Sequence, residues 1–206
     1  MKKLSLSLFV IFVVFFGFVA MRKDDFSKLH EGDLIFQTSL SSQSKAIQLA
    51  TKSKYSHCGI LFRENGRWFV FEAIQPVKKT TLESWIKRGQ NKKYVVKRLK
   101  DESVLNADVL RKMQLVGKTM IGKNYDLGFG WSDDKIYCSE LIWKIYKRGA
   151  GIEIGKLQKL RDFDLSDATV KSILKARYGN KIPLDETVIS PVSIFESGNL
   201  KTVLSK

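Results

Sequence analysis

The dipeptide Asn65-Gly66 places the strongest local constraint on how this chain can fold. It stands between two β-rich runs, residues 55–63 and 68–74, which carry aromatic and branched aliphatic side chains. Asn-Gly between such runs is typical of a two-residue turn, because both turn positions need a positive φ angle. The sequence therefore predicts a β-hairpin here.

A two-residue turn also fixes the register of the hairpin. If Glu64 pairs with Arg67, counting back along both strands places Gly59 opposite Glu72. Side chains alternate between the faces of a strand, so His57 and Glu72 are expected on one face as diagonal neighbours. Cys58 is expected on the opposite face.

The remaining pattern predicts helices and strands in segregated blocks, which is typical of the α+β class. With 206 residues, 44% of them hydrophobic, the chain is long enough for one domain with a sizeable core. We expect an antiparallel sheet packed against helices in a domain of residues 30–206. The predicted elements are strands at residues 32–37 and 94–99; helices at 41–52, 81–88, 104–121 and 136–148; a loop at 122–134; and a turn at Ser190-Pro191.

Residues 1–23 resemble an export signal or a membrane anchor. Lys2 and Lys3 precede residues 4–20, seventeen residues without a charge. A basic start before an apolar run directs export, and the charge balance favours a domain outside the cytoplasm. Phe18 occupies a position where signal cleavage after Ala20 would need a small residue, so cleavage stays open. The predicted location is the cell envelope, in the periplasm or on the extracytoplasmic face of the membrane.

The chain carries a formal net charge of +15. A solvated basic surface is one interpretation; the other is attraction to an anionic membrane surface or a cell-wall polymer. We expect no nucleic-acid partner, because no nucleic-acid-binding motif accompanies the charge. The sequence leaves the oligomeric state open.

Cys138, His57 and Glu72 are the candidate catalytic residues. Cys138 lies at the start of a predicted helix, where the helix dipole stabilises a thiolate and free backbone N–H groups can hold an oxyanion. A carboxylate beside His57 would fix its tautomer and stabilise its protonated form. Together they would form a nucleophile, a general base and the group that orients that base.

Each of these residues also has an ordinary structural interpretation. His57 could be a structural residue, Glu72 a solvent-facing one and Cys138 an inert core thiol. A Cys58–Cys138 disulfide is a further alternative, expected to compete with catalysis because Cys138 would have to reach the face opposite His57. The two histidines and two cysteines lack a zinc spacing, so we expect neither a metal nor a cofactor, and without Cys-x-x-Cys a thiol oxidoreductase is disfavoured.

Six short motifs, spread from about residue 30 to the end, resemble the YiiX-like cysteine hydrolases, circularly permuted relatives of the NlpC-type papain-like amidases. They are Gly32-Asp33-Leu34-Ile35-Phe36-Gln37, Ser56-His57-Cys58-Gly59-Ile60, Phe71-Glu72-Ala73, Tyr125-Asp126, Tyr137-Cys138-Ser139-Glu140-Leu141 and Ile189-Ser190-Pro191-Val192-Ser193. As expected for a permuted chain, His57 and Glu72 precede Cys138 instead of following it.

The resemblance implies a circularly permuted papain-like (NlpC-type) fold and a triad of Cys138, His57 and Glu72. It also implies hydrolysis of an amide or ester, or acyl transfer, through a thioester. Tyr125 and Tyr137 would line the substrate site or pack in the core. A cell-wall peptide and a lipid both remain open as substrates, and the alternative function is a non-catalytic envelope protein that binds either one.

Overall fold

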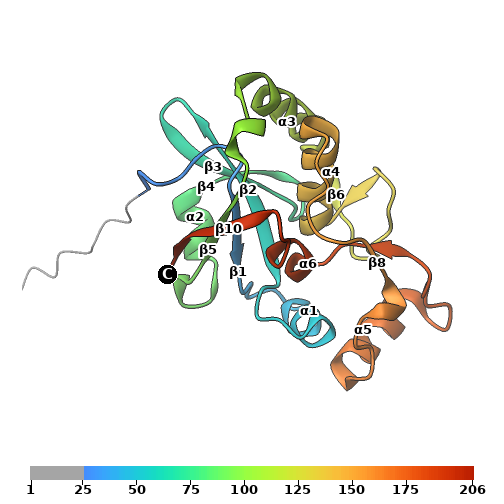
Figure 1. Cartoon of the computed structure of the whole chain (residues 1–206). Coiled ribbons are helices and arrows are strands. Elements are labelled where there is room, and N and C mark those ends of the chain that lie inside the picture. Colours follow the sequence, from blue (N-terminus) through green and yellow to red (C-terminus); the bar gives the residue numbers. More distant parts are fainter. Residues whose placement is uncertain (1–25) are drawn as a thin grey trace, which may run out of the picture.

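Antiparallel strands form the central sheet of the computed structural model, which describes residues 26–206. In this part of the chain the sheet has six strands in the order β10-β5-β1-β2-β3-β4. They are β1 (Leu34–Gln37), β2 (His57–Glu64), β3 (Arg67–Glu72), β4 (Lys78–Thr81), β5 (Val95–Leu99) and β10 (Leu200–Ser205). The C-terminal strand β10 therefore completes a sheet that the first half of the chain begins (Figure 1).

The predicted hairpin and its register are confirmed. Glu64 pairs with Arg67 and Ile60 with Phe71, so strands β2 and β3 are aligned as the Asn-Gly turn requires. Asn65 has a φ of 48° and Gly66 a φ of 78°, the positive values that a turn of this kind needs. This register determines where the side chains of His57 and Glu72 lie.

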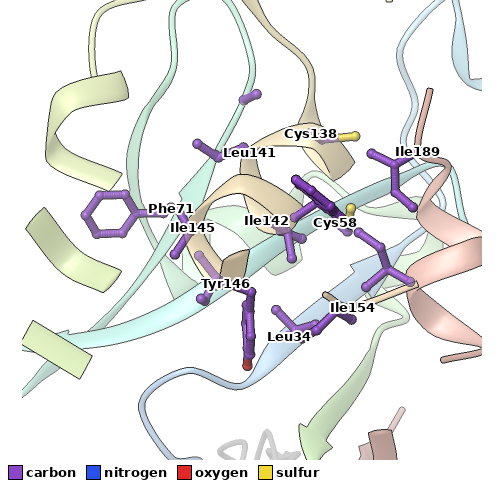
Figure 2. Packing of buried hydrophobic residues seen from close by; sticks show 14 of the residues in the cluster. Leu34, Cys58, Phe71, Cys138, Leu141, Ile142, Ile145, Tyr146, Ile154 and Ile189 are labelled. Atoms are coloured by element: carbon purple, nitrogen blue, oxygen red, sulfur yellow. The ribbon is translucent and has the colours of Figure 1, made fainter. Parts of the chain in front are cut away.

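Helices cover both faces of the sheet (Figure 1). Helices α3 (Ala107–Met120) and α4 (Cys138–Ala150) pack on one face, where α4 inserts Leu141, Ile142 and Ile145 among apolar side chains of the strands (Figure 2). Helix α2 (Leu82–Lys87) packs on the other face, with Trp85 fully buried. Alternate strand residues thus enter two different apolar clusters, as the period of two requires.

A smaller apolar cluster joins helix α1 (Ser44–Thr51) to helix α5 (Ala168–Tyr178) beside this core. Figure 1 shows α5 at the periphery of the molecule, with α1 next to the sheet. The remaining elements are short and connect these parts. They are α6 (Pro191–Phe195), β6 (Asn124–Tyr125), β7 (Lys135–Ile136), β8 (Gln158–Lys159), β9 (Thr187–Val188) and 3₁₀ turns at Gln90–Lys92, Glu102–Val104 and Leu160–Asp162.

Two predictions from the C-terminal half need correction. Ser190-Pro191 is not a turn: Ser190 caps α6, its hydroxyl accepting the N–H of Ser193 at 3.1 Å, and Pro191 takes the first helical position. Residues 122–134 are not all loop, because β6 pairs with β7.

The predicted export signal or anchor, residues 1–23, lies outside the described residues. Within residues 26–206 the structure contains no helix with the length and apolar character needed to cross a membrane.

Candidate active site

Cys138 is the first residue of helix α4. Tyr137 precedes it in an extended conformation, and the Tyr137 N–H donates to the Glu140 carboxylate at 3.2 Å, which holds the start of the helix. The Cys138 side chain is 2% exposed, at the end of α4 where the helix dipole favours a negative charge. The predicted position of this thiol at a helix start is therefore correct.

His57 and Glu72 form a buried ion pair on the sheet. His57 Nε2 lies 2.7 Å from Glu72 Oε2, and Glu72 is fully buried. The other carboxylate oxygen accepts the Thr80 hydroxyl at 2.5 Å and an N–H of Arg88. Burial raises the pKa of Glu72, but the bonds from His57 and Thr80 and the charges of His57 and Arg88 more than offset it, so the pKa is lowered. Glu72 is thus held as a carboxylate.

The imidazole of His57 is also held by an aromatic neighbour on the other side of the sheet. Its ring stacks on Trp85 of α2, with ring centroids 5.8 Å apart and planes 24° apart. Gly59 leaves room for the neighbouring strand, because a Cβ there would lie 2.2 Å from Val70 Cγ1. Glu72 occupies Nε2, so Nδ1 is the ring nitrogen left for Cys138.

Cys138 and His57 form a hydrogen bond that favours an ion pair. The pKa of the Cys138 thiol is lowered well below its usual range. A hydrogen bond with Cys58 lowers this pKa most, and the hydrogen bond to His57 and the charge of His57 lower it further. Burial acts in the opposite direction, because it raises the pKa of a thiol. Burial lowers the pKa of His57, but hydrogen bonds and charges from Cys138 and Glu72 raise it to about 9. Both pKa shifts therefore favour a thiolate paired with an imidazolium.

Cys58 interacts with Cys138, but the two form no disulfide. Both cysteines are free and buried, and Figure 2 shows them in the same apolar cluster as Ile189. Cys138 interacts with both Cys58 and His57, so the expectation that reaching Cys58 would take it away from His57 is wrong. His57 is the first residue of β2, so its ring lies at the end of the strand. There the side chain of Cys138, at the start of α4, contacts both His57 and Cys58.

Two cavities meet at the site, and Tyr125 and Gln43 line both. A cleft of about 710 Å³ is lined by His57, while an apolar pocket of about 90 Å³ is lined by Cys138. Gln43 donates to the Tyr125 hydroxyl at 2.8 Å, and Arg177 donates to Gln43 at 2.7 Å. Gln43 and Tyr125, far apart in sequence, form the partition between the two spaces, and Arg177 supports Gln43 from the pocket side.

The two tyrosines predicted to line the site differ in their surroundings. Tyr125 faces both cavities. Tyr137 is 2% exposed; it contributes to the pocket wall, and its hydroxyl accepts the Ile189 N–H at 3.0 Å. Sequence reasoning missed Thr80, Arg88, Gln43 and Arg177, because only the tertiary fold brings them to the site.

The described residues, 26–206, contain no group of three or more His, Cys, Asp or Glu side chains that could hold a metal ion. The groups around Cys138 and His57 instead bond to one another, as the hydrogen bonds above show.

Comparison with known proteins places this geometry in a family. Residues 28–204 match the permuted papain-like amidase enzymes of the YaeF/YiiX, C92 family. Over 172 residues the chain is 51% identical to the uncharacterized protein YiiX of Escherichia coli K12, covering 84% of each protein.

A crystal structure of YiiX from Escherichia coli O157:H7, described as a metalloprotein, superposes with a TM-score of 0.83 at 49% identity. The match covers 87% of this chain and 98% of that one. The predicted family and the α+β, permuted papain-like fold are confirmed. The chain belongs to the permuted papain-like amidase family that contains YaeF and YiiX, the C92 family.

Proposed function

We propose that this protein is an exported cysteine hydrolase that cleaves an amide or ester through a thioester on Cys138. The observation that carries the proposal is the buried arrangement of Cys138, His57 and Glu72, in which the thiol pKa is lowered and the imidazole pKa raised. The amidase family to which the chain belongs supports the same reaction class. A protein that only bound its ligand would have no need of a thiolate.

In the proposed reaction the Cys138 thiolate attacks the carbonyl carbon and forms a C–S bond. The backbone N–H groups in the first turn of α4 stabilise the oxyanion. The C–N or C–O bond then breaks, and the His57 imidazolium gives its proton to the leaving group. Water next attacks the thioester, His57 accepts a proton from that water, and the C–S bond breaks to release the acid and the thiolate. Glu72 stabilises the imidazolium before the first proton transfer and again after the second.

The pH dependence of thiol alkylation tests the ion pair. Between about pH 6 and about pH 8 a free cysteine with a pKa near 8.5 alkylates roughly 80-fold faster at the higher pH. Because the pKa of Cys138 is lowered, we expect its rate with iodoacetamide to stay almost flat over this range and to fall only when acid protonates the thiolate. Mass spectrometry of the peptides assigns the modified thiol.

The same ion pair determines how turnover falls at high pH. The leaving group needs the imidazolium, so turnover should fall as pH rises through about 9, the pKa of His57. Cys58, whose pKa is raised by burial, should stay unmodified near neutral pH and serves as the internal control. Alkylation of Cys138 that rises with pH as in a free cysteine would contradict the proposal.

We further propose that the domain works at an anionic membrane surface in the cell envelope. The net charge of +15 supports this, and so do Leu40 and Leu127, which are 71% and 55% exposed beside His57 in the cleft. The purified protein should sediment with vesicles containing phosphatidylglycerol and be released by salt. Replacing both leucines with serine should weaken binding, and equal binding to neutral vesicles would contradict the electrostatic part.

A further inference from the structure

The cleft beside His57 carries a permanent positive charge close to the reacting groups. Arg88 lines this cleft together with His57, and the Arg88 side chain is 42% exposed. Within residues 26–206, the part of the chain that the structure describes, no Asp or Glu lines the cleft. The mechanism uses Arg88 only to hold Glu72, so the exposed part of its guanidinium has no role in it.

We propose that Arg88 binds an anionic group, a phosphate or a carboxylate, on the leaving group of the substrate. Arg88 is then a specificity-determining residue, and the preferred substrates are acyl compounds whose alcohol or amine half carries a negative charge. This inference rests on the proposed function, because it takes the cleft beside His57 as the place where the leaving group is protonated.

The guanidinium of Arg88 has more donors than Glu72 uses. A guanidinium presents five N–H groups, and the bond to Glu72 Oε1 comes from Nη2. Glu72 is fully buried, and its other oxygen lies 2.7 Å from His57 Nε2. A ligand in the cleft therefore meets the guanidinium and not the carboxylate behind it. The planar fork of a guanidinium also matches the oxygens of a carboxylate or phosphate.

The backbone that carries Arg88 is fixed against the segment that follows β1. Gly89 forms an antiparallel bridge with Ser39. The Gln90 N–H donates to the Thr38 carbonyl at 2.9 Å. The guanidinium is thus presented from an ordered support, which reduces the entropy lost when it binds a ligand.

Arg88 lies close enough to His57 for one small leaving group to contact both. The two side chains bond to the same carboxylate, that of Glu72, one at each oxygen. Two hydrogen bonds across a carboxylate separate His57 Nε2 from Arg88 Nη2 by no more than about 8 Å. An anion a few bonds from the leaving atom can therefore reach Arg88 while His57 delivers the proton.

The rest of the cleft suits a polar leaving group. Hydroxyl and amide groups can donate to the oxygens of an anion without adding a charge that repels it. The formal net charge of +15 attracts anionic ligands over a longer range. The uncharged polar residues that line the cleft are Gln37, Ser39, Ser41, Ser42, Gln43, Ser56, Gln75 and Tyr125.

Three acetate esters that differ at the far end of the leaving group test this inference. They are the acetates of 4-hydroxybenzoate, 4-hydroxyphenyl phosphate and 4-hydroxybenzamide, and each rate is divided by that of the same ester with hydroxide. A charged hydrogen bond is worth about tenfold to hundredfold, and we expect about tenfold in kcat/KM for the anionic esters because Arg88 is partly exposed. The larger gain identifies carboxylate or phosphate, and added salt should reduce both gains.

Arg88→Gln should abolish the preference, and Arg88→Lys should keep part of it. Loss of Arg88 also weakens the support of Glu72, so the readout is the ratio between esters and not the absolute rate. Thr80→Val is the matched control, because it removes the other donor to the same oxygen of Glu72. It should lower kcat/KM for all three esters and leave their ratio unchanged. Arg63→Gln, at an exposed position near the hairpin end of β2, should change neither, and circular dichroism checks the folding of each variant.

A second measurement needs no turnover. Benzoate or phenyl phosphate bound in the cleft should slow the alkylation of Cys138 by iodoacetamide more than benzamide does, and Arg88→Gln should remove this difference. Equal kcat/KM for anionic and neutral esters, a preference that Arg88→Gln retains or Thr80→Val removes, or equal protection by the three compounds would overturn the inference. If Cys138→Ala abolishes turnover in those cases, the proposed function survives; turnover that does not need Cys138 would overturn both.

Discussion

Replacing Cys138 with alanine is expected to lower kcat/KM for ester hydrolysis by at least about 10⁴-fold, because no thioester can then form. Under the proposed mechanism this thiol is the nucleophile. Its pKa is lowered, it lies at the start of α4, and it bonds to His57. The measurement is kcat/KM with 4-nitrophenyl butyrate, with circular dichroism to check the fold.

Cys58→Ala is the matched control for Cys138→Ala, since it removes the other buried thiol. Its loss takes away the hydrogen bond that most lowers the pKa of Cys138, so alkylation of Cys138 should shift towards higher pH. Activity should fall far less than in Cys138→Ala, because the nucleophile remains. Equal losses in both variants would mean that the thiol pair has a structural role.

Replacing His57 with alanine is expected to lower kcat/KM by about 10³- to 10⁴-fold. Two effects combine. The proton for the leaving group is lost, and Cys138 loses a hydrogen bond and a positive charge that lower its pKa. Alkylation of Cys138 near neutral pH should therefore slow in this variant and rise with pH towards the behaviour of a free cysteine.

His30→Ala provides the matched control, because His30 is the other histidine of the chain. It lies at the surface and pairs with Glu102 at 3.0 Å, on a different part of the molecule. Its replacement should leave both kcat/KM and the alkylation profile unchanged. A His57→Ala variant that kept a flat alkylation profile would show that the thiolate does not depend on this imidazole.

The sequence was informative wherever the determinants are local. Asn65-Gly66 fixed the register, and the register placed His57 and Glu72 on one face. The pattern of residues 136–148 placed Cys138 near a helix start, within two residues of the observed boundary. Each of these inferences needs only a turn geometry or a periodicity.

The parts that could not be predicted depend on tertiary packing. The contact between Cys58 and Cys138 joins β2 to the start of α4, and nothing local determines their spacing. The support of Glu72 by Arg88 depends on how the end of α2 lies over the sheet. The apolar pocket is formed by helices α1 and α5, more than a hundred residues apart, so no local pattern reveals it.

The Gln43–Tyr125 partition has a kinetic consequence under the proposed mechanism. While the acyl group is attached to Cys138, which lines the pocket side of this hydrogen bond, the first product departs through the cleft that His57 lines. The next molecule must enter by the same path, which is ping-pong behaviour. The cleft, and not the pocket, then decides whether the acceptor is water or an alcohol or amine, so one acyl-enzyme can serve as a hydrolase or a transferase according to what fills that side.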